Sequence, residues 1–313
     1  MRWRSSHGKI TVESSLPRED ERDAFLQIRP MNDVAFHFIF GRESRKYNLL
    51  NLLNAILAKT QEIPIEYITL EETELKTETL GLKSCRLDIR ARTSQKHHIN
   101  IEVQLLNQAN MEKRSLYYWS KLYANQLREG QDYRELEKTI TINILDFPYL
   151  SNDKVHSIYK VLEIETLAEL SGILEIHFLE VPRLQDYAVD LNCALTRWLL
   201  FLSDHTTHEL KEAILMNDPN IQHAYEDLAK LAADKDAKRQ YELREKAERD
   251  FRSTVRSAHE EGLQEGLQEG LQEGAKQERM RLARKLLAEG LDEDLIKRTA
   301  EVTQLELDAI RKD

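Results

Sequence analysis

Cysteine is almost absent from this chain of 313 residues. Its two cysteines, Cys85 and Cys193, lie far apart and form no CxxC pair. Disulfide frameworks and zinc sites need several cysteines, or cysteines and histidines at short spacing, so we expect neither here. Such sparse use of cysteine is typical of proteins that work in a reducing compartment.

Long apolar runs are also missing. No stretch reaches the roughly 18–20 apolar residues of a membrane span, and the first residues lack the apolar core of a signal peptide. We therefore expect a cytoplasmic protein with no membrane contact. The net charge of −10 argues against a generally basic protein that coats DNA, although it does not exclude one basic cleft.

What the chain does contain is two short alternating runs, residues 86–92 and 99–105, in which apolar and polar residues strictly alternate. Alternation with period two predicts half-buried β-strands, and the polar segment between the runs predicts a hairpin loop centred on Gln95. A slip of one residue would turn one apolar set towards solvent, so the register is well determined. Antiparallel pairing about Gln95 puts Asp88 opposite Glu102, Arg86 opposite Gln104 and Arg90 opposite Asn100.

In this register Asp88 and Glu102 share one face, with their Cβ atoms about 5 Å apart. Two carboxylates on rigid strands form a site for a hard divalent cation, because Mg²⁺ takes oxygen ligands and usually one or two protein carboxylates. The alternative is two ordinary surface carboxylates held near Arg86, Arg90 and Arg92. Spacing alone leaves both interpretations open.

The same residues carry a resemblance. An Asp strand, LDIRA, is followed by an Asn-Ile-Glu-x-Gln strand, INIEVQ, after the segments MNDVAFHFIFG and NLLNAIL and before a helix that contains RSLYYWSKLY. This ordered set, from about Arg29 to about Leu184, resembles the core of PD-(D/E)XK nucleases and, more narrowly, the recombination-promoting nuclease (Rpn) family of transposase-like proteins. The resemblance implies an α/β fold: a restriction-endonuclease-like mixed-sheet core, here with a C-terminal helical extension.

The resemblance also implies an activity, namely DNA endonuclease cleavage that depends on Mg²⁺ or Mn²⁺ and is linked to recombination or mobile elements. Asp88 and Glu102 would hold the metal, together with the main-chain carbonyl of Val103. Gln104 stands where the wider superfamily has lysine; it is neutral, so it could position a water but could not act as a general base. Asn100 and Asp33 are further candidates beside the site, although the position of Asp33 favours a role as the cap of the helix that follows it.

Basic side chains near the two strands are candidates for contact with DNA phosphates. A helix is predicted after residue 107 and is expected to end at Gly130. Its aromatic residues suit packing, as in any amphipathic helix, while its basic residues could follow a phosphate backbone. The candidates are Arg86, Arg90, Arg114 and Lys121.

Composition divides the chain into five predicted segments. They are a flexible tail (1–25), the nuclease-like domain (26–205), a charged helical extension (206–258), an EGLQ-repeat linker (259–275) and a small helical module (276–313). Glycine every four residues weakens a helix by about 1 kcal/mol per glycine relative to alanine, which favours a spacer over an interaction segment. Thr303 and Glu306 have the spacing of a capping box.

Two functions besides DNA cleavage fit parts of this pattern. The acidic balance and the long charged helix would suit a non-catalytic interaction or scaffold protein built on a nuclease fold, including a homodimer through the C-terminal helices. Residues 291–313 resemble a small helix-turn-helix, but they contain few basic residues for reading DNA. We expect DNA as the partner and no small-molecule cofactor.

Overall fold

The computed structural model describes residues 28–71, 89–107 and 109–311. Six strands form one mixed sheet in the order β1-β2-β3-β4-β6-β5. The strands are β1 (Ile68–Glu71), β2 (Ile89–Thr93), β3 (His98–Gln104), β4 (Thr139–Leu145), β5 (His156–Tyr159) and β6 (Leu174–Glu180). The sheet therefore contains the hairpin that the alternation of residues 86–92 and 99–105 predicts.

Helices precede the sheet, interrupt it between β3 and β4, and follow its last strand in the sequence. Before the hairpin lie α2 (Asp33–Phe40), the 3₁₀ turn η1 (Glu43–Arg45) and α3 (Lys46–Leu57), and between β3 and β4 lie α4 (Met111–Ala124) and η2 (Tyr133–Glu135). After β6 follow η3 (Val181–Asp186), α5 (Ala194–Leu202), α6 (His208–Asn217), α7 (Pro219–Ala233), α8 (Lys235–Ala288), α9 (Glu293–Ala300) and α10 (Gln304–Ile310). Helix α4 ends earlier than predicted, and Gly130, with φ of +86°, lies in the loop that follows.

The predicted hairpin register is confirmed where the structure describes it. Strands β2 and β3 are antiparallel and pair Arg90 with Asn100 and Ile89 with Ile101. Strands β3, β4 and β6 are parallel, with Glu102 beside Asn143. Asp88 and Arg86 lie outside the described residues, so their pairing with Glu102 and Gln104 stays a prediction.

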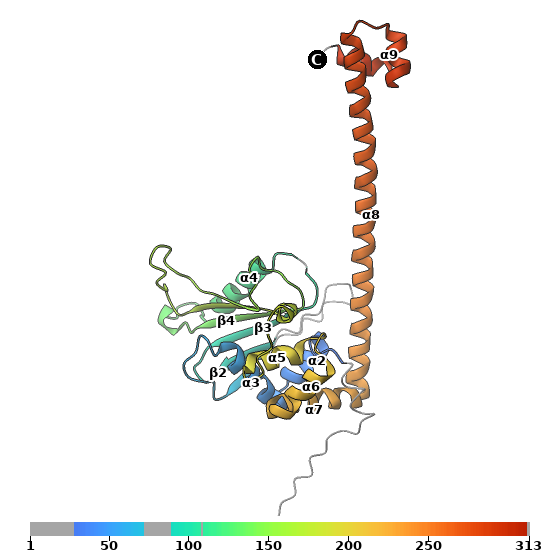
Figure 1. The fold of residues 1–313 in the computed structure, drawn as a ribbon. Helices are drawn as coiled ribbons and strands as arrows, with labels where there is room; N and C mark the ends of the chain where they lie inside the picture. The colour runs from blue at the N-terminus through green and yellow to red at the C-terminus, as the bar shows by residue number, and fades with distance from the viewer. Residues whose placement is uncertain (1–27, 72–88, 108, 312–313) are drawn as a thin grey trace, which may run out of the picture. The chain divides into compact units, whose positions relative to one another are not determined.

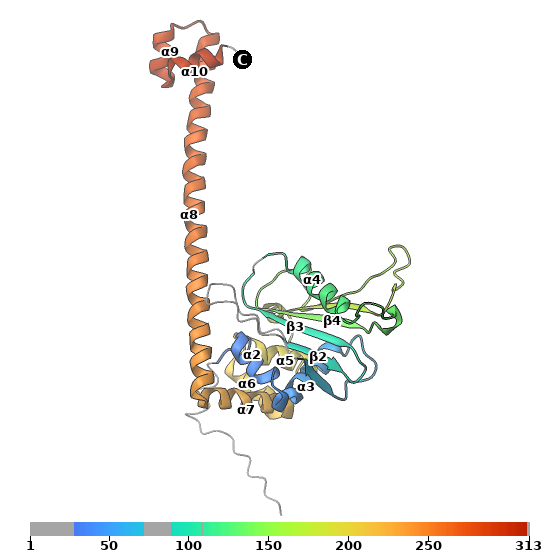
Figure 2. The ribbon, with the colours of Figure 1, turned by 180° about the vertical axis from the view of Figure 1, so that it is seen from behind.

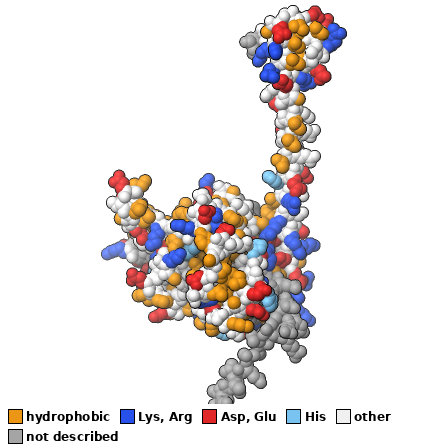
Figure 3. Space-filling view, viewed as in Figure 1, with side chains coloured by type: hydrophobic (Ala, Val, Ile, Leu, Met, Phe, Trp, Pro, Cys, Tyr) orange, Lys and Arg blue, Asp and Glu red, His pale blue; other side chains and the backbone are white. Residues whose placement is uncertain are grey.

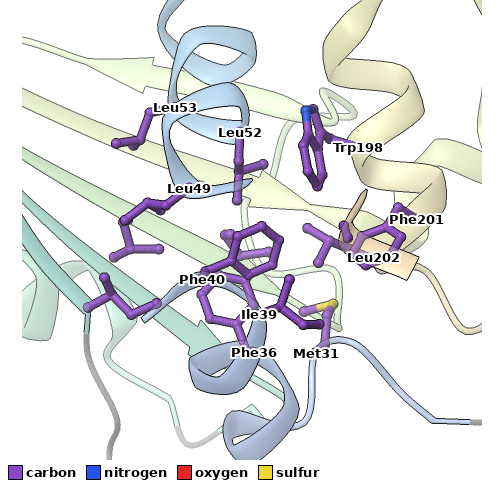
Figure 4. Packing of buried hydrophobic residues seen from close by; sticks show 14 of the residues in the cluster. Met31, Phe36, Ile39, Phe40, Leu49, Leu52, Leu53, Trp198, Phe201 and Leu202 are labelled. Carbon is purple, nitrogen blue, oxygen red and sulfur yellow. The ribbon is translucent and has the colours of Figure 1, made fainter. Parts of the chain in front are cut away.

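The two faces of the sheet are covered differently. Helix α4 lies on one face, and α2, α3, α5, α6 and α7 lie on the other (Figures 1 and 2). The larger layer contains the main apolar core, where α2, α3 and α5 meet and contribute Phe36, Phe40, Leu49, Leu52, Trp198 and Phe201 (Figure 4). Ile99 and Ile101 of β3 point into this core and are fully buried.

The structure divides the chain at a different place from the sequence. One compact unit is Met1–Glu245 and the other is Lys246–Asp313. Helices α6 and α7 lie beyond the predicted boundary at residue 205, yet they bury Ile214, Ile221 and Leu228 in the same core as the sheet. Residues 259–275, the predicted EGLQ-repeat linker, are helical and belong to α8.

The second unit has a small core of its own. Ala283 near the end of α8 packs with Ile296 of α9 and with Leu307 and Ile310 of α10. The predicted capping box is confirmed, because the Thr303 side chain accepts from the Glu306 N–H while the Glu306 carboxylate accepts from the Thr303 N–H. Within the described ranges, no helix is both long enough and apolar enough to cross a membrane.

Candidate active site at the end of strand β3

Three polar side chains of β3 face α4 and are buried. The exposed fractions of Asn100, Glu102 and Gln104 are 2%, 1% and 8%. The sequence predicts a half-buried strand, but β3 is central in the sheet and both of its faces are covered. A carboxylate in such a place is costly unless charge and hydrogen bonds compensate it, so the contacts of Glu102 decide what the site is.

Glu102 is compensated from two sides. The Gln104 side-chain amide donates to Glu102 Oε1 at 2.8 Å. The Arg114 guanidinium of α4 donates to the same oxygen and forms an ion pair with the carboxylate. The amide and the guanidinium therefore converge on one buried carboxylate oxygen.

Helix α4 is anchored so that Arg114 reaches this carboxylate. Ser115 is fully buried and donates through Oγ to Asn143 Oδ1 of β4 at 2.9 Å. The Met111 N–H donates to the Tyr149 hydroxyl at 2.9 Å, and the Trp119 indole N–H donates to the Thr139 carbonyl at 2.9 Å. These three contacts hold the helix along β4 and present Arg114 to β3.

A second row of buried polar atoms lies next to Glu102 on the same face. Arg90, Asn100 and Thr141 are neighbours across β2, β3 and β4. Among the residues that the structure describes, Arg90 Nε, both amide atoms of Asn100 and Thr141 Oγ1 are buried and have no hydrogen-bond partner. Buried polar groups in native proteins nearly always have a hydrogen-bond partner. Buried donors and acceptors without one therefore call for an explanation, and a functional site is one such explanation.

The other predicted site residues are placed as follows. Asp33 opens α2 and pairs with Arg244 at 2.7 Å, while Asn32 is the residue that caps this helix. Lys121 is exposed on α4 and Arg90 is half-buried on β2. The Val103 side chain is partly buried against the main core, and metal binding by its carbonyl stays a prediction. Asp88 and Arg86, the remaining candidates, lie outside the described residues.

Sequence reasoning missed a carboxylate at the same edge of the sheet. Asp146 directly follows β4, and its N–H donates to the Gln104 carbonyl at 2.9 Å. Its carboxylate pairs with Arg29 Nη2 at 3.1 Å, and the same guanidinium contacts Asp204. The carboxyl ends of parallel strands meet at one edge, so an acidic residue just after a buried strand was the signal available in the sequence.

A second buried glutamate lies on the opposite face of the sheet. Glu175 of β6 is fully buried and accepts hydrogen bonds from Thr60, Lys138 and His177, each at 2.6 Å. Burial acts to raise the pKa of Glu175, but these hydrogen bonds outweigh it and lower the pKa to about 2. His177 in turn contacts His156 at 2.8 Å, and burial, with smaller contributions from His177 and Lys59, lowers the pKa of His156 to about 3.

The oxygen atoms of the side chains beside β3 are suitable ligands for a hard cation. Carboxylate and amide oxygens are ligands that Mg²⁺ accepts, and the Arg114 ion pair shows that a positive charge fits beside Glu102. Over the described ranges, no group of three or more His, Cys, Asp and Glu side chains could hold a metal ion. The predicted second carboxylate, Asp88, is outside those ranges.

Comparison with known proteins gives one match. A family model described as PD-(D/E)XK nuclease family transposase matches residues 30–258, which include the whole sheet and α2 to α7. No curated protein and no solved structure matches this chain.

Proposed function

Because the chain belongs to the PD-(D/E)XK nuclease family transposases, with a mixed α/β sheet that suits this fold, we propose that it is a DNA endonuclease. It would hydrolyse phosphodiester bonds with Mg²⁺ or Mn²⁺ and act in recombination or in mobile-element processes. The observation that carries the proposal is Glu102, a carboxylate 1% exposed at the end of central strand β3, beside Gln104. An apolar residue at this position would cost less free energy of folding than a buried carboxylate. The carboxylate is therefore expected to have a function.

Each residue has a role that its chemistry allows. Glu102 would hold the metal together with Asp88, whose position opposite Glu102 stays a prediction from the sequence. The Val103 carbonyl is a third candidate ligand. Gln104 would orient the attacking water through its amide, and Asn100 would hydrogen-bond near the reacting groups.

A divalent cation at this site would make its bound water more acidic and would stabilise the leaving oxygen. The protein supplies the fixed strand that orients the carboxylates and the covered face that excludes bulk water. Lys121 is exposed, and together with Arg86, Arg90 and Arg114 it is our candidate for phosphate contact.

The test is nicking of supercoiled plasmid by the full chain, with Mg²⁺ or Mn²⁺ compared with EDTA. Wild type is expected to nick only with metal, and Glu102→Gln and Asp88→Asn are expected to lower nicking by about 10²-fold or more. Glu129→Gln, which changes an exposed glutamate after α4, is the matched surface control. Equal nicking by wild type and Glu102→Gln, or no metal-dependent nicking by wild type, would contradict the proposal.

A second candidate function is favoured by the exposed part of α8. Leu263, Leu267 and Leu271 recur every four residues and are 67%, 64% and 68% exposed. Hydrophobic side chains are visible along the surface of this helix (Figure 3). We propose that α8 pairs with α8 of a second copy, so that the chain forms a homodimer. If cleavage is absent, this helix would make the chain a scaffold protein.

Sedimentation of the full chain tests the pairing. Wild type is expected to be a dimer and Leu267→Gln to shift it towards monomer. Leu243→Gln is the matched control, because Leu243 lies on the same helix, is 58% exposed and is outside the repeat. A wild-type monomer at all concentrations would contradict the pairing, without bearing on cleavage.

A further inference from the structure

We propose that Arg114 takes the place of the divalent cation beside Glu102 when the metal is absent, and that it competes with the metal for this carboxylate. The inference rests on the proposed function and concerns the regulation of the same site. Arg114 would be both the counter-ion of the resting site and, once displaced, a ligand for the DNA phosphate.

The burial of Glu102 makes a counter-ion necessary. The carboxylate is 1% exposed, and the described groups that compensate it are the neutral Gln104 amide and the Arg114 guanidinium. Without metal, the guanidinium supplies positive charge to a group that would otherwise be costly to bury. A divalent cation at the same carboxylate would be repelled by the guanidinium, because like charges within a few ångströms disfavour each other.

The surroundings of Arg114 allow its side chain to leave while its helix stays. The Ser115 contact to Asn143 and the Met111 contact to Tyr149 fix the backbone of α4. The Arg114 side chain itself is 17% exposed, whereas Glu102 is almost completely enclosed. A long side chain that reaches the surface can exchange partners without unfolding any element.

Arginine also suits the second partner. Its planar guanidinium binds phosphate through two parallel hydrogen bonds, which lysine cannot do. Arrival of metal and DNA together would replace one anionic partner of Arg114, the carboxylate, by another, the phosphate. The site would then bind metal weakly when metal is alone and more tightly when DNA is also present.

Calorimetric titration of the full chain with Mn²⁺ tests this competition. Arg114→Gln is expected to bind Mn²⁺ about tenfold or more tightly than wild type, since one nearby charge changes the affinity of a group for a proton by about one to three pKa units. Lys113→Gln is the matched control: it removes one positive charge from the adjacent, exposed position of α4 and is expected to leave the Mn²⁺ affinity within about threefold of wild type.

Thermal unfolding provides a second readout that does not need activity. Arg114→Gln is expected to have a lower Tm than wild type in EDTA and a larger rise in Tm on addition of Mn²⁺, because the metal then replaces the lost counter-ion. Should Arg114→Gln fail to fold in EDTA, Arg114→Lys keeps the positive charge, and its Mn²⁺ affinity is expected to stay near that of wild type.

The outcomes separate the two proposals. Mn²⁺ binding by wild type with no gain in Arg114→Gln, or a gain in Arg114→Lys equal to that expected for Arg114→Gln, would overturn the competition and leave the nuclease proposal intact. Absence of Mn²⁺ binding by wild type and by Arg114→Gln would overturn both. Tighter binding in Arg114→Gln, with slower cleavage at saturating Mn²⁺, is the result we expect.

Discussion

Two buried glutamates lie on opposite faces of one sheet, and their surroundings differ. Glu175 is bonded at both carboxylate oxygens, by Thr60 and His177 at Oε1 and by Lys138 at Oε2. Glu102 receives its described donors, Gln104 and Arg114, at Oε1. Both carboxylates are at most 1% exposed, so burial alone does not tell them apart.

The difference lies in what the partners can do. The partners of Glu175 come from three parts of the chain: Thr60 follows α3, Lys138 precedes β4 and His177 lies on β6. Together they enclose Glu175, which makes it a structural centre. Arg114 is a single long side chain that reaches the surface and can give way to another cation. A buried carboxylate is therefore a candidate site when its counter-ion can be replaced, and a fixed part of the fold when its partners enclose it.

The sharpest test of this contrast is Glu102→Gln. Cleavage is expected to fall by about 10²- to 10⁴-fold, because a metal contributes several kcal/mol of transition-state stabilisation and this change removes one of its ligands. The Tm in EDTA is expected to change much less than in Glu175→Gln. Single-turnover cleavage and thermal unfolding of both variants measure the contrast. A Glu102→Gln protein that cleaves like wild type but unfolds readily would reverse the assignment.

The next largest effect is expected for Glu175→Gln, on stability. Breaking a buried ion pair on one side leaves Lys138 without its charge partner and costs about 3–5 kcal/mol. Urea unfolding at pH 7 measures the loss. Glu169→Gln removes a partly exposed partner of Lys160 and is the control, with an expected cost of at most about 1 kcal/mol. Equal costs for the two variants would show that Glu175 is not a structural centre.

The hairpin of the sheet could be predicted from the sequence, because the local alternation of apolar and polar residues contains the information. In the described hairpin, a one-residue slip would expel Ile99 and Ile101 from the core, which is why the predicted pairing of Arg90 with Asn100 is confirmed. The burial of the polar face could not be predicted in the same way. It depends on the strand order, which places β3 at the centre, and on α4, which covers it.

The long-range contacts of the site were also beyond local patterns. Arg114 was a phosphate candidate because it is basic, and only the packing of α4 on β4 reveals that it binds Glu102. The membership of α6 and α7 in the core was missed because rising charge along residues 206–258 resembles a solvent-exposed extension, although Ile221 and Leu228 are buried. Family resemblance predicted the candidate site residues on β3, and their roles, like the pairing of Asp88, stay predictions.

A smaller effect is expected from pH, through the histidine chain behind Glu175. Burial keeps His156 neutral in the fold, with its pKa lowered to about 3 from 6.5, so the unfolded chain binds a proton that the folded chain does not. Stability should therefore fall as pH falls below 6.5, by at most about 1.4 kcal/mol per pH unit for one proton. Below pH 4.5 Glu175 adds to the loss, since its pKa is lowered to about 2.

Urea unfolding between pH 7 and pH 4.5 measures this slope. His156→Gln is expected to flatten it, although not to abolish it, because burial also lowers the pKa of His37 and His97. His208→Gln, at a position whose side chain is 61% exposed on α6, should leave the slope as in wild type. A slope unchanged by His156→Gln would mean that His156 takes up its proton without loss of the fold.

The smallest effect, with the opposite sign, is expected beside the site. Asn100 is 2% exposed, and neither of its amide atoms has a hydrogen-bond partner in the described part of the chain, so an apolar side chain of similar size should remove a desolvation cost. Asn100→Leu is expected to stabilise the protein by about 1 kcal/mol and to slow cleavage. Thr141→Val, which removes the neighbouring unpaired hydroxyl, is the matched comparison. A loss of stability in both variants would mean that ordered water satisfies these polar groups. The row of Arg90, Asn100 and Thr141 would then be a structural part of the fold, like Glu175, and not part of the candidate site with Glu102.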